Sequence, residues 1–157
     1  MQPRVRIGLI IGVIGLVLNV CVAGFFGVCG PLVSLLGGGV AGFFAAQQEH
    51  ASTKSLGARY GAIAGAITGG LILIGQMIGG VSALAFMQYS GIKIGLGAIP
   101  TPSASPAEQA IYYLSGAGTA ICIGLIGVVL ATLVGAGAGY MTTQELPTPP
   151  ISSNPIN

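Results

Sequence analysis

Long apolar stretches, separated by short polar segments, run through almost the whole chain. A helix that crosses a bilayer needs about 20 mostly apolar residues. By this measure the pattern predicts an all-α fold with four transmembrane helices. Gly30 and Pro31 separate the first two, because Gly ends a helix and Pro suits the first turn of the next. The predicted helices cover residues 7–28, 31–47, 57–87 and 110–143.

Two of the predicted helices depart from the ordinary length of a span. Residues 31–47 hold a short apolar run, so we expect the ends of this helix to lie shallow in the membrane. Residues 110–143 would form a helix of about 50 Å. A helix of that length must tilt, protrude from the bilayer or break near Gly116 and Gly118.

One domain, residues 1–146, holds all four predicted helices. A short polar loop, residues 48–56, connects the second and third helices. A longer loop with three prolines, residues 88–109, connects the third and fourth. The tail, residues 147–157, is Pro-rich and uncharged, a composition that favours extended or disordered chain.

The composition excludes a soluble domain. The chain has 157 residues, of which 53% are hydrophobic and 5% are charged, and its mean hydropathy is +0.90. A typical soluble domain is about 25% charged. The first helix has the basic start of a signal peptide, but no small-residue cleavage site follows it, so we expect it to remain uncleaved. The sequence therefore predicts an integral membrane protein.

Basic residues lie mainly on one side of the predicted helices. Arg4 and Arg6 precede the first helix, Lys54 and Arg59 lie between the second and third, and Lys93 alone lies between the third and fourth. Basic loops stay on the cytoplasmic side. The sequence therefore predicts cytoplasmic N- and C-termini, and we expect a bacterial cytoplasmic membrane.

Aromatic residues give an independent indication of the same arrangement. All ten fall near predicted helix ends, as in the aromatic belts of membrane interfaces. Those near the outer ends are Phe25, Phe26, Phe86, Tyr89, Tyr112 and Tyr113, and those near the inner ends are Phe43, Phe44, Tyr60 and Tyr140.

The second and fourth predicted helices end alike. Residues 38–47 and 135–144 both carry Gly-xxx-Gly, an aromatic residue, a large apolar residue, two small residues and Gln. We interpret the chain as two helical hairpins related by tandem duplication. Parallel repeats of this kind imply a pseudo-two-fold axis along the membrane normal.

Glycines four residues apart give the predicted helices small-residue faces, because such positions share one face of a helix. Faces of this kind let two backbones approach closely in lipid. We expect packing within the chain, centred on the third helix; contacts between chains and a glycine-lined pore are the alternatives. The predicted helix-packing residues are Gly57, Gly61, Gly65, Gly69, Gly75, Gly79, Gly38, Gly42, Gly135 and Gly139.

Few polar side chains lie well inside the predicted helices, and none of these is charged. Intramembrane charges usually mark pumps and proton-coupled transporters, so their absence from the sequence argues against those classes. Asn19 and Gln76 are expected to form interhelical hydrogen bonds rather than to bind a solute. Thr68, with Thr119 and Thr132, is expected to bond to the backbone of its own helix.

The chain offers no constellation typical of an enzyme or a metal site. Glu49 and His50 are adjacent but lack a nucleophile and an orienting group, and one His with three scattered Glu is too few to hold a metal. The Gly37–Gly39 run lacks the setting of a phosphate loop, and no basic patch suggests nucleic-acid binding. We therefore expect no catalytic, cofactor-binding or metal-binding residue.

Three stretches resemble small bacterial membrane proteins with four glycine-rich spans, which carry no assigned activity. The stretches are residues 29–33 (Cys-Gly-Pro-Leu-Val), 41–43 (Ala-Gly-Phe) and 61–67 (Gly-Ala-Ile-Ala-Gly-Ala-Ile). By span count and Gly spacing, the chain is also loosely similar to the four-span glycine-zipper proteins of mitochondrial protein translocases. The resemblance implies a glycine-zipper membrane fold and no functional residue.

These observations predict a non-enzymatic accessory or structural subunit of a larger membrane complex. Its partners would be the lipid bilayer and other membrane proteins, or further copies of itself. A small channel or facilitator for a neutral solute, lined by Asn19, Gln76 and Thr68, is the first alternative. A membrane assembly or insertion factor is the second.

Overall fold

The part of the chain that the structure describes consists of four helices and their short connections. The computed structural model describes residues 2–23, 30–90 and 105–144. The predicted tail and most of the predicted outer loop lie outside these residues. The helices are α1 (Pro3–Ala23), α2 (Gly30–Gln48), α3 (Lys54–Ser90) and α4 (Pro106–Thr142). The all-α prediction is confirmed, and each helix overlaps one of the predicted spans.

Of the four described helices, three are long and apolar enough to cross a membrane. These are α1, α3 and α4, so the prediction of four spans is wrong by this criterion. The exception is α2, which is 19 residues long. It begins at Gly30 and Pro31 and ends at Gln47 and Gln48, so its apolar stretch is shorter than the helix itself. The described chain has the build of an integral membrane protein.

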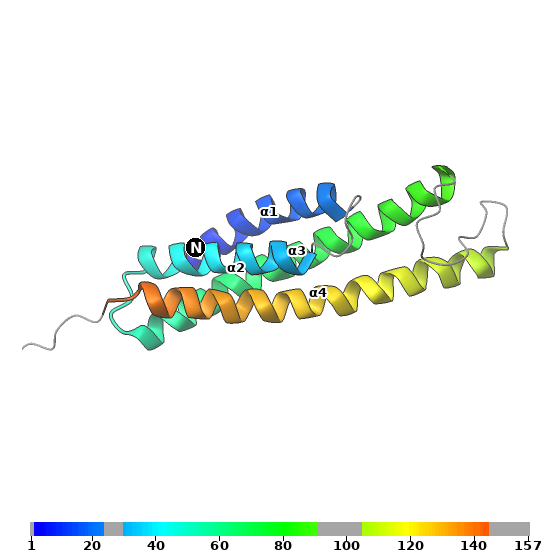
Figure 1. The fold of residues 1–157 in the computed structure, drawn as a ribbon. Helices are drawn as coiled ribbons and strands as arrows, with labels where there is room; N and C mark the ends of the chain where they lie inside the picture. Colours follow the sequence, from blue (N-terminus) through cyan, green and yellow to red (C-terminus); the bar gives the residue numbers. More distant parts are fainter. Residues whose placement is uncertain (1, 24–29, 91–104, 145–157) are drawn as a thin grey trace, which may run out of the picture.

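The long helices α3 and α4 form an antiparallel pair on which the shorter α1 and α2 pack (Figure 1). Neighbouring residues show the directions: Gly8 and Gly15 of α1 lie against Ala64 and Ile72 of α3, so these two helices are parallel. Helices α2 and α4 are likewise parallel. Both α2 and α3 contact every other described helix, whereas α1 and α4 do not contact each other.

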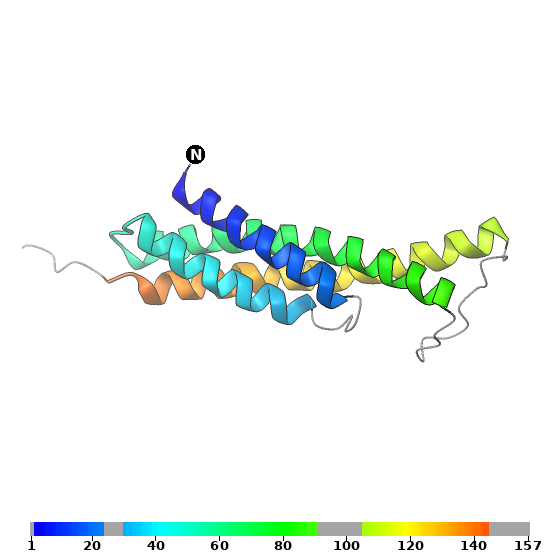
Figure 2. The same ribbon diagram turned by 90° about the horizontal axis from the view of Figure 1, so that it is seen from above.

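The pair α3 and α4 extends well beyond the ends of α1 and α2 (Figures 1 and 2). Both helices have 37 residues, about 55 Å, against 21 residues in α1. Of the three alternatives for the long fourth helix, the break near Gly116 and Gly118 does not occur, because α4 is one continuous helix. Helix α4 is therefore uninterrupted over its full length, and α3 has the same number of residues.

The predicted two-fold arrangement of hairpins is only partly reproduced. Its parallel pairs are present, since α1 runs along α3 and α2 along α4. A two-fold axis would also make the contact between α1 and α4 equivalent to that between α2 and α3, and only the second exists among the described helices. The hairpin of α1 and α2 is displaced toward α3 from the symmetric position, and the small residues of α1 contact that helix.

The connection from α2 to α3 is fixed by a helix-ending motif at His50. This residue has a φ of 46°, in the left-handed region that Gly normally occupies at this position. The Ala51 N–H donates to the Ala46 carbonyl at 3.5 Å and the His50 N–H to the Gln47 carbonyl at 3.3 Å. This is the Schellman pattern, so His50 lies where the backbone ends α2.

Replacing His50 with Gly is expected to raise the free energy of unfolding by about 0.5 kcal/mol, because Gly adopts a positive φ without the steric penalty of other residues. Thermal unfolding in detergent micelles measures the change. Ala51→Gly is the matched control, because His50 alone has a positive φ among the described non-Gly residues; it should lower stability. A loss of stability in His50→Gly would contradict the assignment.

Candidate functional site: the helix seams and the charged end

The closest contact in the fold is a seam between α3 and α4 built from small residues. A methyl group added to Gly61 would overlap the Gly135 carbonyl, and one added to Gly65 would overlap that of Ala131. The same holds for Gly57 against Gly139. A methyl group added to Gly69 would lie 3.0 Å from the Val128 Cα and 3.1 Å from the Ala131 Cβ, closer than ordinary van der Waals contact. The backbones of α3 and α4 can touch here only because these positions lack side chains.

The seam continues along both helices, with contacts every four residues on α4 and at spacings of seven and four residues on α3. Beyond Gly69, Leu73 lies against Gly124, Gly80 near Ala120 and Leu84 against Gly116. Each step of four residues shifts the contact by about 40° around a helix. Contacts that wind in this way are typical of right-handed crossings between membrane helices.

A second seam joins α2 to α4. A methyl group added to Gly38 would come within 2.5 Å of the Ala131 Cα, and one added to Gly42 within 2.6 Å of the Gly135 Cα. Gly135 also lies close to the Gly38 carbonyl, so α4 is contacted by both α2 and α3 at this residue. The structure thus gathers eight of the ten predicted packing glycines into two adjoining seams.

The remaining two predicted positions, Gly75 and Gly79, leave the stripe of Gly57 to Gly69. Gly75 faces α1, and a methyl group there would lie 2.9 Å from the Leu16 carbonyl oxygen; Gly79 is buried. The spacing from Gly69 to Gly75 is six residues, which places them on different faces. The glycines from Gly57 to Gly69 and the pair Gly75 and Gly79 each keep a four-residue spacing, but the two groups do not face the same helix.

Two of the three predicted polar residues hold α1 against α3. The Asn19 side chain, only 1% exposed, donates from Nδ2 to the Ile72 carbonyl at 3.0 Å. The Thr68 hydroxyl donates to the Gly8 carbonyl of α1 at 3.1 Å. The prediction for Thr68 was therefore wrong: Gly8 brings the α1 backbone within its reach, so the bond crosses to another helix.

The third predicted polar residue, Gln76, lies one turn beyond Ile72 on α3 and is 5% exposed. It faces α4, since a methyl group on Gly124 would lie 3.6 Å from Gln76 Oε1. Asn19 and Thr68 are thus on the α1 side of α3, and Gln76 is on the α4 side. The three residues therefore contact different neighbouring helices.

The hydroxyls on the outer surface bond to their own helices. Thr119 donates to the Ser115 carbonyl and Thr132 to that of Val128, as predicted, and Ser82 donates to that of Ile78. Such bonds satisfy a hydroxyl without a partner helix or water. Large apolar side chains cover most of the same surface, among them Ile10, Leu36, Ile74, Leu125, Val129 and Leu133.

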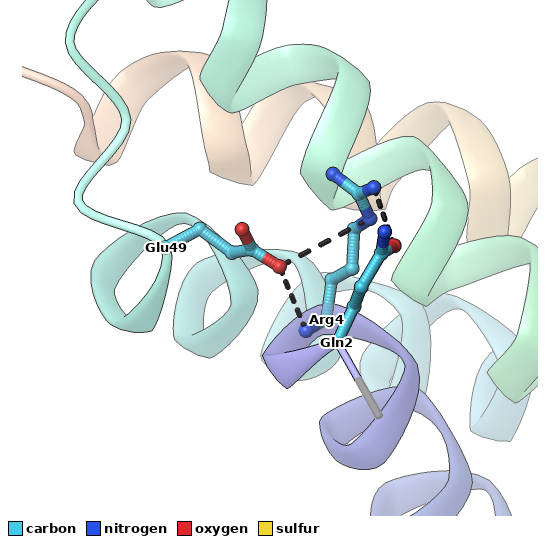
Figure 3. A network of polar contacts seen from close by, with 3 residues as sticks. All are labelled: Gln2, Arg4 and Glu49. Carbon is cyan, nitrogen blue, oxygen red and sulfur yellow. Dashed lines mark hydrogen bonds and ion pairs between the residues drawn. The ribbon is translucent and has the colours of Figure 1, made fainter.

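Charged residues meet at the end of the bundle where α1 and α3 begin and α2 and α4 finish. The Arg4 N–H donates to the Glu49 carboxylate at 3.2 Å, and the guanidinium Nε lies 4.0 Å from the same oxygen (Figure 3). The negative charge of Glu49 thus lies at the N-terminus of α1, where it interacts favourably with the positive end of the helix dipole. The Arg4 guanidinium also lies 4.7 Å from the centre of the Tyr60 ring.

The basic residues at this end have different surroundings. Lys54 Nζ lies 5.6 Å from the centre of the Tyr140 ring, whereas Arg6 and Arg59 are exposed. Pairs of a cation and an aromatic ring suit a membrane interface, where rings lie at headgroup level. We call this region the charged end. Both predicted inner-end tyrosines, Tyr60 and Tyr140, belong to it.

The structure adds little chemistry beyond these contacts. Among the described residues, no three His, Cys, Asp or Glu side chains lie close enough together to hold a metal ion. Sequence reasoning did not identify Ser34, which is buried against Gly127, or the role of Glu49 at the start of α1. A lone Ser in an apolar helix was a signal for the first; no sequence pattern pairs residues 4 and 49.

Comparison of the chain with protein-family models, with curated proteins and with solved structures finds no match.

Replacing Gly65 with Leu is expected to lower the free energy of unfolding by at least about 2 kcal/mol, because the side chain must force α4 away from α3. Thermal unfolding in detergent micelles measures the change. The matched control is Gly70→Leu, because a methyl group at Gly70 meets no atom within 4 Å. Equal stability of the two variants would show that the seam does not constrain the fold.

Thr68→Val is expected to lower the free energy of unfolding by about 1 kcal/mol, because the bond to α1 is lost while the side-chain shape is retained. Thr132→Val is the control, since its hydroxyl bonds only to its own helix, and should change stability by less. The same measurement applies to both. A larger effect in Thr132→Val would contradict the assigned role of Thr68.

Proposed function

We propose that this protein is a non-enzymatic accessory subunit of a larger membrane protein complex, packed against its partners through apolar helix faces. The observation that carries the proposal is how the polar groups inside the bundle and at its charged end are used. Asn19 and Thr68 donate to backbone carbonyls of neighbouring helices, and Glu49 is engaged with the start of α1. These groups stabilise the bundle, and the chain offers partners its outer helix faces.

The orientation expected from the basic residues supports the same proposal. Arg4, Arg6, Lys54 and Arg59 lie at the charged end, which we assign to the cytoplasmic side. Both chain ends would then be cytoplasmic. This requires α2 to carry the chain back across the membrane between the parallel helices α1 and α3, so in this proposal the short α2 crosses together with the three longer helices. A bacterial cytoplasmic membrane is the location we propose.

A channel or facilitator for a neutral solute receives less support. A path within one chain would need Asn19, Thr68 and Gln76 to face a common space. Two of them are occupied by hydrogen bonds between helices, and Gln76 lies beside Gly124 of α4. An assembly or insertion factor would use the same apolar faces, but its partners would be transient.

Gentle extraction of a tagged chain from its native membrane, followed by a native gel and mass spectrometry, tests the accessory-subunit proposal. We expect a complex in which at least one other membrane protein is present in a fixed ratio. An extract from cells that carry the untagged chain is the control. A band that holds this chain alone would overturn the proposal and direct attention to solute flux in liposomes. Partners at variable, substoichiometric amounts would indicate an assembly factor.

A further inference from the structure

Two of the buried polar side chains in the bundle differ from the rest. Gln76 of α3 is 5% exposed and Ser34 of α2 is 2% exposed. Within the part of the chain that the structure describes, neither of these side chains forms a hydrogen bond. The other buried polar side chains in that part all form one, and they are Asn19, Thr68, Gln88 and Thr143.

Gln76 and Ser34 lie at the same level of the bundle. A methyl group added to Gly37 of α2 would lie 3.2 Å from the Ile72 Cδ1 of α3. Ser34 precedes Gly37 by about one turn of α2. Gln76 follows Ile72 by about one turn of α3, and since α2 and α3 are antiparallel, it comes to the level of Ser34.

Both side chains also contact one face of α4. A methyl group added to Gly127 would lie 2.9 Å from the Ser34 hydroxyl oxygen. One added to Gly124 would lie 3.6 Å from Gln76 Oε1. Residues three apart are neighbours on a helix surface, with side-chain positions about 5 to 6 Å apart. Two hydrogen bonds of about 2.8 Å that meet at a single water molecule span a similar distance.

A molecule of the size of water can reach the polar atoms of both side chains. In the described part of the structure, every side-chain nitrogen or oxygen that is completely enclosed has a hydrogen-bond partner. Gln76 and Ser34 have no such partner there, so their polar atoms are not completely enclosed. Some space therefore adjoins the amide and the hydroxyl.

This space lies deep within the bilayer. Gln76 is about 24 Å past Tyr60 along α3, and Gly124 is about as far from Tyr140 along α4. Both tyrosines pair with basic side chains at the charged end, at headgroup level of a bilayer about 40 Å thick. Lipid tails form no hydrogen bonds. Leaving an amide without a partner there costs more free energy than holding one water molecule in place.

We propose that a bound water molecule lies between Gln76 and Ser34 and bridges α3 and α2 beside α4. The amide can donate and accept, and so can the hydroxyl, so one water molecule can bond to both. The bridge supplies hydrogen bonds between α2 and α3, two helices in contact that share no hydrogen bond among the described residues. The site is inside the chain, so it does not depend on whether other subunits bind.

Solid-state NMR of the isotope-labelled chain in lipid bilayers tests the site through the transfer of magnetisation from water to side-chain amide protons. We expect rapid transfer to Gln76. Asn19 is the matched control, because its amide lies at nearly the same depth but donates to the Ile72 carbonyl, and it should receive little. An absence of transfer to Gln76, or equal transfer to both amides, would overturn the proposal.

Thermal unfolding of Gln76→Met in detergent micelles gives a second test. Met keeps the length of Gln but forms no such hydrogen bonds, so loss of the bridge should lower the unfolding midpoint by about 2 to 4 °C. If the space holds no water, the substitution removes an amide without a partner and should raise the midpoint instead. An unchanged or higher midpoint would therefore overturn the proposal.

The variants Ser34→Ala and Gln76→Met, made singly and together, test whether one molecule joins the two side chains. Each removes the same bridge, so the double variant should be about as stable as the less stable single variant. Ser82→Ala is the control, because the Ser82 hydroxyl is exposed and bonds to its own helix, and it should leave the midpoint unchanged. Losses that add up in the double variant would contradict a shared water molecule.

Discussion

The close approach of the α3 and α4 backbones is the contact on which the rest of the structure depends. Gly61 and Gly65 lie against the carbonyls of Gly135 and Ala131, where no side chain would fit. Gly135 also receives α2 through Gly42, so the position of the second helix follows from the first pair. In lipid, where apolar burial does not draw helices together, such close packing supplies much of the attraction.

Polar groups add hydrogen bonds and an ion pair between specific positions of the packed helices. Asn19 and Thr68 each donate a hydrogen bond across the contact between α1 and α3, and Arg4 with Glu49 joins the ends of α1 and α2. A bilayer offers no water to satisfy such groups, so the partners must come from the protein. The hydroxyls of the outer surface bond to their own helices instead, which leaves apolar side chains to face lipid or other proteins.

The two hairpins have unequal lengths. Helices α1 and α2, of 21 and 19 residues, are about as long as a hydrocarbon layer is thick. Helices α3 and α4 have 37 residues each. Helices of that length must tilt within a bilayer or protrude from it.

The sequence was enough to predict the four helices, their membrane character and the end at which the charges gather, because hydropathy and charge act locally along the chain. It also identified the small-residue positions, since a four-residue spacing defines one helix face. The neighbour that each face meets became known from the arrangement of the helices in space. Gly75 contacts α1 rather than α4, and the Thr68 hydroxyl donates to the Gly8 carbonyl rather than to a carbonyl of its own helix. The spacing of residues along a helix shows whether one of its faces is small, polar or apolar. The helix that packs against this face depends on how segments distant in sequence are arranged in space, and the local pattern does not contain that arrangement.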